Sequence, residues 1–156
     1  MRKFAFALTA CALFNLAQPL AASTAKSQAQ CAPLGKSKVA LLALKNAGWQ
    51  IDADAERNRF VLALVDCNGS PDPELRDGIA FEATQHYLRK GLVNETTLAE
   101  LSTKLQAQLV EPDKSGFRRP FAALNLSEVA RTDRIKSWMT PDQRGQLVEA
   151  SVDYMR

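Results

Sequence analysis

The sequence is poor in the residues that most often carry catalytic or metal chemistry. His86 is the only histidine among 156 residues, and there are three cysteines. A structural zinc site takes about four cysteine or histidine ligands. Cys11 lies in an apolar run that we expect to be removed, and we expect the other two cysteines to be oxidised, so too few ligands remain. The sequence also has no nucleophile elbow, no dinucleotide-binding fingerprint and no calcium-loop spacing. We therefore predict no metal site and no cofactor.

Glycine and proline are also scarce, with seven of each, which excludes a collagen-like or low-complexity chain. Hydrophobic residues make up 46% and charged residues 24% of the sequence. That balance is typical of one soluble globular domain and too apolar for a disordered chain.

The N-terminus has the pattern of a secretory signal peptide. Arg2 and Lys3 precede an apolar run over 4–17, and small residues follow it. The run is shorter than the roughly 20 residues that a spanning helix needs, so we predict no stable membrane span. We expect a signal peptide over 1–22, with cleavage as late as residue 25, an N-terminal extension over 23–35 and a helical domain over 36–156. This predicts a periplasmic or secreted protein.

Removal of the signal peptide also removes most of the apparent positive charge. Without Arg2 and Lys3, 18 basic residues face 17 acidic ones, so the formal charge falls from +3 to +1. A mature chain so close to neutral does not indicate a nucleic-acid partner.

Two cysteines, Cys31 and Cys67, remain after removal of the signal peptide. An even number of cysteines in an oxidising compartment predicts a disulfide, and two unpaired thiols are the alternative. Cys11 offers a second alternative, because residues 8–11 have the form of a lipoprotein cleavage box, which would make Cys11 the lipidated first residue.

The apolar spacing of the mature chain is helical, with no convincing alternating stretch. We expect a first helix that ends at Gly48, a second from Asp52 or Asp54 to Asn68-Gly69, and a third that is capped by Asp72 and ends at Gly91. A fourth helix is capped by Asn94, and a fifth follows Phe117 and ends in a turn at Arg131 to Arg134. The last helix follows the capping box Thr140-Pro141-Asp142-Gln143. We predict an all-α fold of antiparallel helical hairpins, either a stack of helix pairs or a compact bundle. In the last helix, an apolar stripe has no expected partner.

Two segments resemble the bacterial DUF2785 family. They are the run 73–82 followed by Gly91-Leu92, and the run 117–124 followed by Glu128 and Arg131. The resemblance covers roughly residues 41–155 and implies a HEAT-like α-solenoid. No activity is established for that family. Its members continue into a segment with a Gly-Trp and a histidine-containing motif, so we expect this chain either to lack that segment's chemistry, to be a truncated product, or to work without it.

The best polar constellation centres on the third expected helix, where Glu82 and His86 are four residues apart and share a face. We expect polar residues of the fifth helix to approach them. The candidate polar groove comprises Arg76, Asp77, Glu82, His86, Arg118, Arg119, Glu128 and Arg131. The same residues also suit ion pairs and caps that lock neighbouring hairpins together.

Two functions are compatible with this pattern. The first is an exported binding or scaffold module for a protein or peptide. The second is a hydrolase-like or small-ligand-binding enzyme that uses a pocket of Glu82, His86 and Arg118, with His86 as an acid or base. The scaffold is favoured, because one histidine without a nucleophile motif supports catalysis only thinly.

Overall fold

The computed structural model describes residues 31–156, and every regular element in that range is helical. The all-α prediction is confirmed. The expected signal peptide and Cys11 lie outside the described residues. The elements are η1 (Pro33–Gly35), α2 (Lys38–Asn46), α3 (Asp54–Leu64), η2 (Val65–Cys67), α4 (Pro73–Leu75), η3 (Arg76–Phe81), α5 (Glu82–Arg89), α6 (Glu95–Val110), α7 (Arg118–Ile135) and α8 (Pro141–Met155). Within 31–156, none of these helices has the length and apolarity that crossing a membrane requires.

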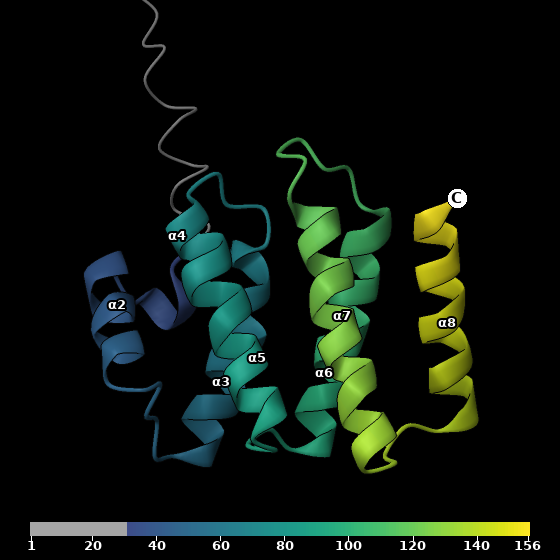
Figure 1. The fold of residues 1–156 in the computed structure, drawn as a ribbon, viewed down its shortest axis with the longest axis horizontal. Coiled ribbons are helices and arrows are strands. Elements are labelled where there is room, and N and C mark those ends of the chain that lie inside the picture. Colours follow the sequence, from purple (N-terminus) through teal and green to yellow (C-terminus); the bar gives the residue numbers. More distant parts are fainter. Residues whose placement is uncertain (1–30) are drawn as a thin grey trace, which may run out of the picture.

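The helices run back and forth and lie side by side in chain order (Figure 1). Helix α2 is at one edge, α3 and the α4–α5 segment come next, the α6–α7 pair follows, and α8 forms the other edge. The most extensive contact joins α6 to α7, while α5 packs on α7 and α8 packs on α6. Loops 111–117 and 90–94 therefore lie at opposite ends of the α6–α7 pair.

The helix starts agree with the expected caps. The side chains of Asp72 and Asn94 accept hydrogen bonds from the first turns of α4 and α6, and Thr140 forms a capping box with Gln143 at the start of α8. These caps use bonds between residues two or three positions apart, so the local sequence is enough to predict them.

The predicted turn at Arg131 to Arg134 is wrong, because α7 continues through these residues to Ile135. The chain turns later, where the Asp133 carboxylate accepts hydrogen bonds from the backbone nitrogens of Trp138 and Met139 at 2.8 and 2.7 Å. Pro120 lies in the first turn of α7, where its missing N–H costs nothing.

The third expected helix contains an irregularity that the sequence did not predict. Between α4 and α5 the chain makes the π-helical turn η3, in which the backbone N–H of Glu82 donates to the carbonyl of Asp77. The carbonyl of Gly78 instead accepts a hydrogen bond from Lys45 Nζ of α2 at 2.9 Å. Because a π turn holds one extra residue, it rotates the following helical face by about 100°.

Helix α2 ends as Gly48 predicts, with Gly48 and Trp49 both at positive φ. Trp49 is buried, as expected, and its carbonyl accepts a 2.7 Å hydrogen bond from the Tyr87 hydroxyl. Burial raises the pKa of Tyr87 to about 12, so this hydroxyl stays a donor at any physiological pH.

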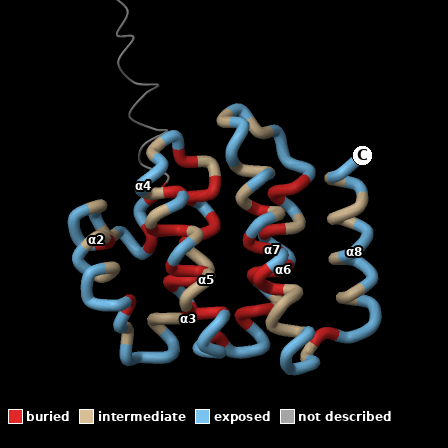
Figure 2. Tube along the Cα trace, in the orientation of Figure 1, coloured by how far each residue is buried: buried red, intermediate tan, exposed pale blue. Residues whose placement is uncertain are grey.

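Burial is uneven across the row of helices (Figure 2). Most of the core comes from α3, α5, α6 and α7, with Phe60, Tyr87 and Leu101 fully buried. Helix α8 contributes no fully buried residue, and Val148 and Met155 are 58% and 74% exposed. The expected apolar stripe of the last helix is therefore only partly covered, because Leu147, Ala150 and Tyr154 pack against the core while Val148 and Met155 stay exposed.

Candidate functional site

The predicted disulfide is present. Cys31 and Cys67 are bonded, with their Cα atoms 4.6 Å apart and 36 positions between them in the sequence. Cys31 and Pro33 are buried, and η1 packs on α3. The bond therefore fastens the first described residues to the turn that ends the α3–η2 segment.

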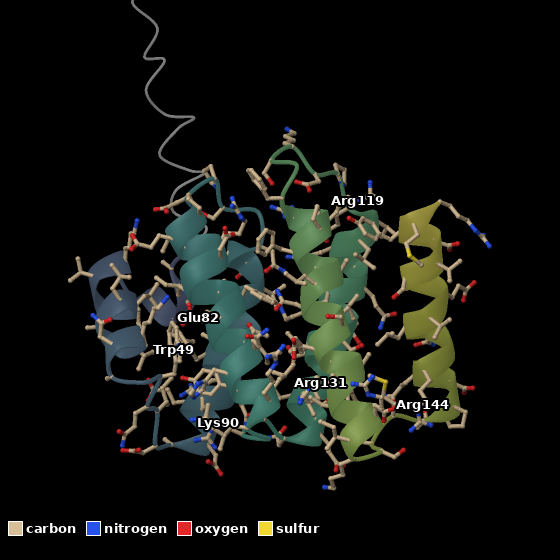
Figure 3. All side chains as sticks on the ribbon, in the orientation of Figure 1. Trp49, Glu82, Lys90, Arg119, Arg131 and Arg144 are labelled. Atoms are coloured by element: carbon tan, nitrogen blue, oxygen red, sulfur yellow. A yellow bond between two sulfur atoms is a disulfide. The ribbon has the colours of Figure 1, made fainter. Side chains whose placement is uncertain are left out.

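Glu82 and His86 lie on α5, and Glu82 turns towards α2 rather than α7 (Figure 3). Glu82 forms an ion pair with Lys45 of α2, at 2.5 Å. Partial burial of His86 lowers its pKa, Lys90 lowers it further, and Glu82 opposes both effects. Within residues 31–156, no hydrogen bond or ion pair joins Glu82 or His86 to Arg118.

Arg76 does approach the start of α7, as expected. Its guanidinium stacks on the ring of Phe117, 3.9 Å from the centroid, with Phe121 at 5.0 Å. The same group donates to both carboxylate oxygens of Asp77 and to the carbonyl of Ser70. Arg76 is 7% exposed, so these bonds replace its hydration and join η3 to the first turn of α7.

Glu128 makes a second link between α5 and α7. Its buried carboxylate accepts two hydrogen bonds from Arg89, at 2.6 and 3.0 Å, and one from Gln85. The bonds from Arg89 lower the pKa of Glu128, burial opposes them, and the charge of Arg131 adds to the lowering. Glu128 is therefore ionised at neutral pH and fully engaged in joining helices.

Arg119 and Arg118 point to different neighbours. The Arg119 guanidinium lies over the ring of Tyr154 in α8, 5.3 Å from the centroid, and its Nε is buried without a hydrogen-bond partner in the described chain. Arg118 is 3.6 Å from the nearest carboxylate oxygen of Glu111. The eight predicted groove residues thus do not line one common groove. Most of them instead connect α5 and α7 to neighbouring helices.

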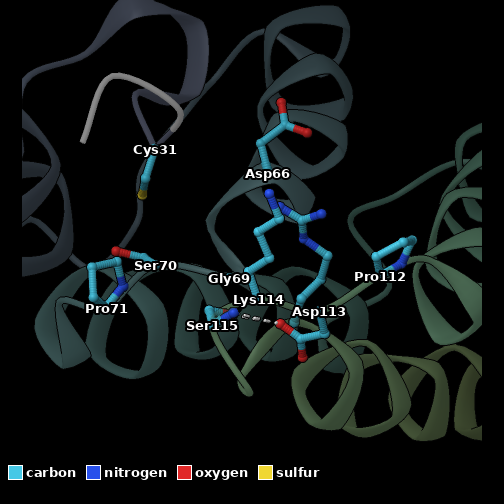
Figure 4. A pocket seen from close by; sticks show the side chains of 10 residues that line it. Cys31, Asp66, Gly69, Ser70, Pro71, Pro112, Asp113, Lys114 and Ser115 are labelled. Atoms are coloured by element: carbon cyan, nitrogen blue, oxygen red, sulfur yellow. Dashed lines mark hydrogen bonds between the residues drawn. The ribbon is translucent and has the colours of Figure 1, made fainter. Parts of the chain in front are cut away.

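Arg118 instead lines an open cleft of about 420 Å³ between two loops at one end of the helices. One wall comes from 66–71 and the other from 112–118. Figure 4 shows Asp66 across the cleft from the loop that carries Asp113 and Lys114. The full lining is Cys31, Asp66, Gly69, Ser70, Pro71, Pro112, Asp113, Lys114, Ser115 and Arg118.

The first wall is held by a buried amide network. Asn68 donates to Gln108 Oε1 at 2.9 Å and accepts from Asn125 Nδ2 at 3.1 Å, and Gln108 donates to the carbonyl of Val65. All three amides are buried, and the network joins η2 to α6 and α7. Together with the Cys67 disulfide, these bonds fix residues 65–70.

The second wall is held by Asp113. Its carboxylate accepts hydrogen bonds from the backbone nitrogens of Ser115, Gly116 and Arg119 and from the Ser115 hydroxyl. Partial burial works against ionisation, but the bonds from Arg119, Ser115 and Gly116 outweigh it and lower the pKa of Asp113. A charged Asp113 thus orders the loop and caps α7.

Sequence reasoning missed most of the cleft. The order Pro112-Asp113-Lys114-Ser115-Gly116 was a usable signal, because aspartate followed by serine and glycine is typical of turns closed by the aspartate side chain. The Asn68, Gln108 and Asn125 network has no local signal, since its members are 40 and 57 positions apart.

No group of three or more histidine, cysteine, aspartate or glutamate side chains in residues 31–156 is placed to hold a metal ion. Comparison of the chain with protein-family models, with curated proteins and with solved structures finds no match.

Proposed function

We propose that the protein is an exported helical binding module that holds a segment of a protein or peptide in the cleft between 66–71 and 112–118. The observation that carries this proposal is a cleft with fixed walls and incompletely paired charges. Its volume of about 420 Å³ falls within the usual range for ligand sites and suits a short peptide segment.

The charges lining the cleft have both signs. Asp66 and Lys114 are exposed and form no ion pair with any residue of the described chain, and the contact of Arg118 with Glu111, at 3.6 Å, is longer than a hydrogen bond. A polypeptide with acidic and basic side chains offers a partner to each of them. Because the walls are ordered by Asp113, the amide network and the disulfide, binding has little loop ordering to overcome.

The alternative, an enzyme with Glu82, His86 and Arg118 around one pocket, has less support. Glu82 is paired with Lys45, and neither Glu82 nor His86 lines the cleft that contains Arg118. The disulfide supports action in an oxidising compartment, in agreement with export.

The test is a titration of the ¹⁵N-labelled full chain with ten-residue peptides that differ only in charge: acidic, basic, mixed and uncharged. We expect the mixed peptide to bind best and to shift the amide signals of Gly69, Ser70, Ser115 and Gly116. The double variant Lys114→Gln with Arg118→Gln should weaken binding roughly tenfold, as loss of two partly exposed ion pairs allows.

The matched control is Arg59→Gln with Lys90→Gln, which removes the same charge from exposed positions outside the cleft. It should bind the mixed peptide like the wild type. Equal losses in both double variants, or shifts confined to other residues, would contradict the proposal.

A further inference from the structure

A second, smaller pocket lies at the opposite end of the α6–α7 pair. Its lining residues come from the end of α5, the start of α6 and the end of α7, and Figure 1 shows these helix ends on the same side of the molecule. Its volume is about 180 Å³. It is lined by Leu88, Arg89, Gly91, Val93, Glu95, Leu98, Thr132, Ile135, Lys136 and Trp138.

The interior of this pocket is apolar and its wall is fixed. Leu88, Val93 and Leu98 line it and are otherwise buried in the core. The Trp138 indole N–H donates to the Thr132 hydroxyl at 2.9 Å, which holds the ring in place. Ile135 stands at the opening with 66% of its surface exposed. An apolar group that enters therefore meets preformed apolar surface on several sides.

The size of the pocket restricts the ligand. Sites for whole small molecules usually measure about 300–1,000 Å³, and this pocket is below that range. It matches one aliphatic side chain, which is how buried anchor residues dock at protein interfaces.

The rim of the pocket favours acidic neighbours of that side chain. Arg89 uses Nε and Nη2 to hold Glu128, so its Nη1 makes no hydrogen bond to the described chain. Lys136 pairs only with Glu95, and both side chains are largely exposed, at 84% and 61%, so the pair is weak and exchangeable. Glu128 and Glu95 balance the two charges, but Arg89 Nη1 and the exposed Lys136 ammonium keep N–H groups free to donate to a further carboxylate.

We propose that this pocket binds an aliphatic side chain of a peptide whose neighbouring residues are acidic. The site shares no lining residue with the cleft of the proposed function and lies at the other end of the helices. Either site can therefore fail its test without affecting the other.

The probe is a fluorescent seven-residue peptide with a central leucine flanked on each side by two glutamates and a terminal glycine, titrated into the full chain. We expect saturable binding that shifts the Trp138 indole signal and the Gly91 amide signal. Replacing the leucine with serine should weaken binding at least tenfold, which is the scale of a buried anchor. Replacing the glutamates with lysines should weaken it as well.

The test variant is Ile135→Glu, which places a negative charge at the exposed opening. The matched control is Val110→Glu, because Val110 is 78% exposed at the far end of α6. We expect Ile135→Glu to lose roughly tenfold in affinity and the control to keep wild-type affinity. Equal binding of the serine peptide, equal binding of N-acetyl-leucine amide alone, or unchanged Trp138 and Gly91 signals would overturn the proposal.

Discussion

An aspartate fixes each end of α7, but the two aspartates bond to partners at different distances along the chain. Asp113 bonds only to its own loop and to the first turn of α7. Asp133 bonds to the backbone of Trp138 and Met139 and also forms an ion pair with Arg144 of α8, at 2.6 Å. The first arrangement orders a polar cleft locally. The second joins α8 to the other helices and holds the wall of an apolar pocket.

The difference shows how one helix pair can offer two surfaces of different chemistry. Helix ends leave backbone groups without partners, and the residues that supply those partners decide what the end exposes. At the Asp113 end, a covalent bond and buried amides reinforce the polar loop nearby. The Asp133 end depends on packing and on a single ion pair to α8.

The largest effect should come from removing the covalent bond at the polar end. We expect the double variant Cys31→Ser with Cys67→Ser to lose about 3–4 kcal/mol of unfolding free energy, because the bond closes a 36-residue loop. Urea unfolding followed by circular dichroism measures this loss. Wild-type protein under a strong reductant should approach the variant, and equal stability of the two proteins without reductant would contradict the expectation.

At the other end, Asp133→Asn should lose about 2 kcal/mol, the scale of hydrogen bonds to a charged group. Bonds from Arg144 lower the pKa of Asp133, burial opposes them, and the backbone bonds of Met139 and Trp138 add to the lowering. A carboxyl whose pKa is lower in the folded state stabilises the protein above its unfolded pKa and loses that contribution as the pH falls.

The stability advantage of wild type over Asp133→Asn should thus be full at pH 7 and shrink below about pH 4. Urea unfolding of both proteins across this range measures it. An advantage that stayed constant down to pH 2.5 would show that the charge of Asp133 is not what holds α8.

Asp113→Asn should have a smaller and more local effect, about 1 kcal/mol, because its partners belong to one loop and one helix start. We expect faster amide hydrogen exchange at Ser115 and Gly116, with Trp138 unaffected. If Asp113→Asn instead speeds amide exchange in α8 more than in the 111–117 loop, the effect of Asp113 is not local and this expectation is wrong.

The same contrast between local and distant bonds explains which features of the fold could be predicted from the sequence. The caps at Asp72, Asn94 and Thr140 depend on bonds over two or three positions, so the helix starts were predictable. The disulfide followed from having two cysteines in the expected mature chain. The end of α7 was not predictable, since it depends on Asp133 reaching forward to residues that read as a separate segment.

The candidate groove shows a second limit. Glu82 and His86 share a helical surface, as their spacing requires, but the spacing does not say which neighbour that surface meets. The extra residue of η3 rotates α5 relative to α4, and Lys45, 33 positions before Gly78, supplies the hydrogen bond that the π turn leaves open. A contact over that distance leaves no pattern in the local sequence.

The smallest effect on stability should come from Gly69→Ala, which sharpens the comparison because it changes the polar cleft without touching either aspartate. An added Cβ would lie 3.2 Å from Nε of Arg118 and 3.4 Å from the Ser115 hydroxyl, so the flexible Arg118 side chain must move. We expect stability to change by less than about 0.5 kcal/mol, since lower chain entropy in the unfolded state offsets the crowding. Affinity for the mixed-charge peptide should nevertheless fall several-fold, as measured by the same titration.

Gly145→Ala on α8, where no neighbouring side chain lies within 4 Å of the added Cβ, serves as the control and should leave that affinity unchanged. Unchanged binding by Gly69→Ala would mean that the position of Arg118 does not matter to the cleft, and the polar end of α7 would then be a structural cap alone.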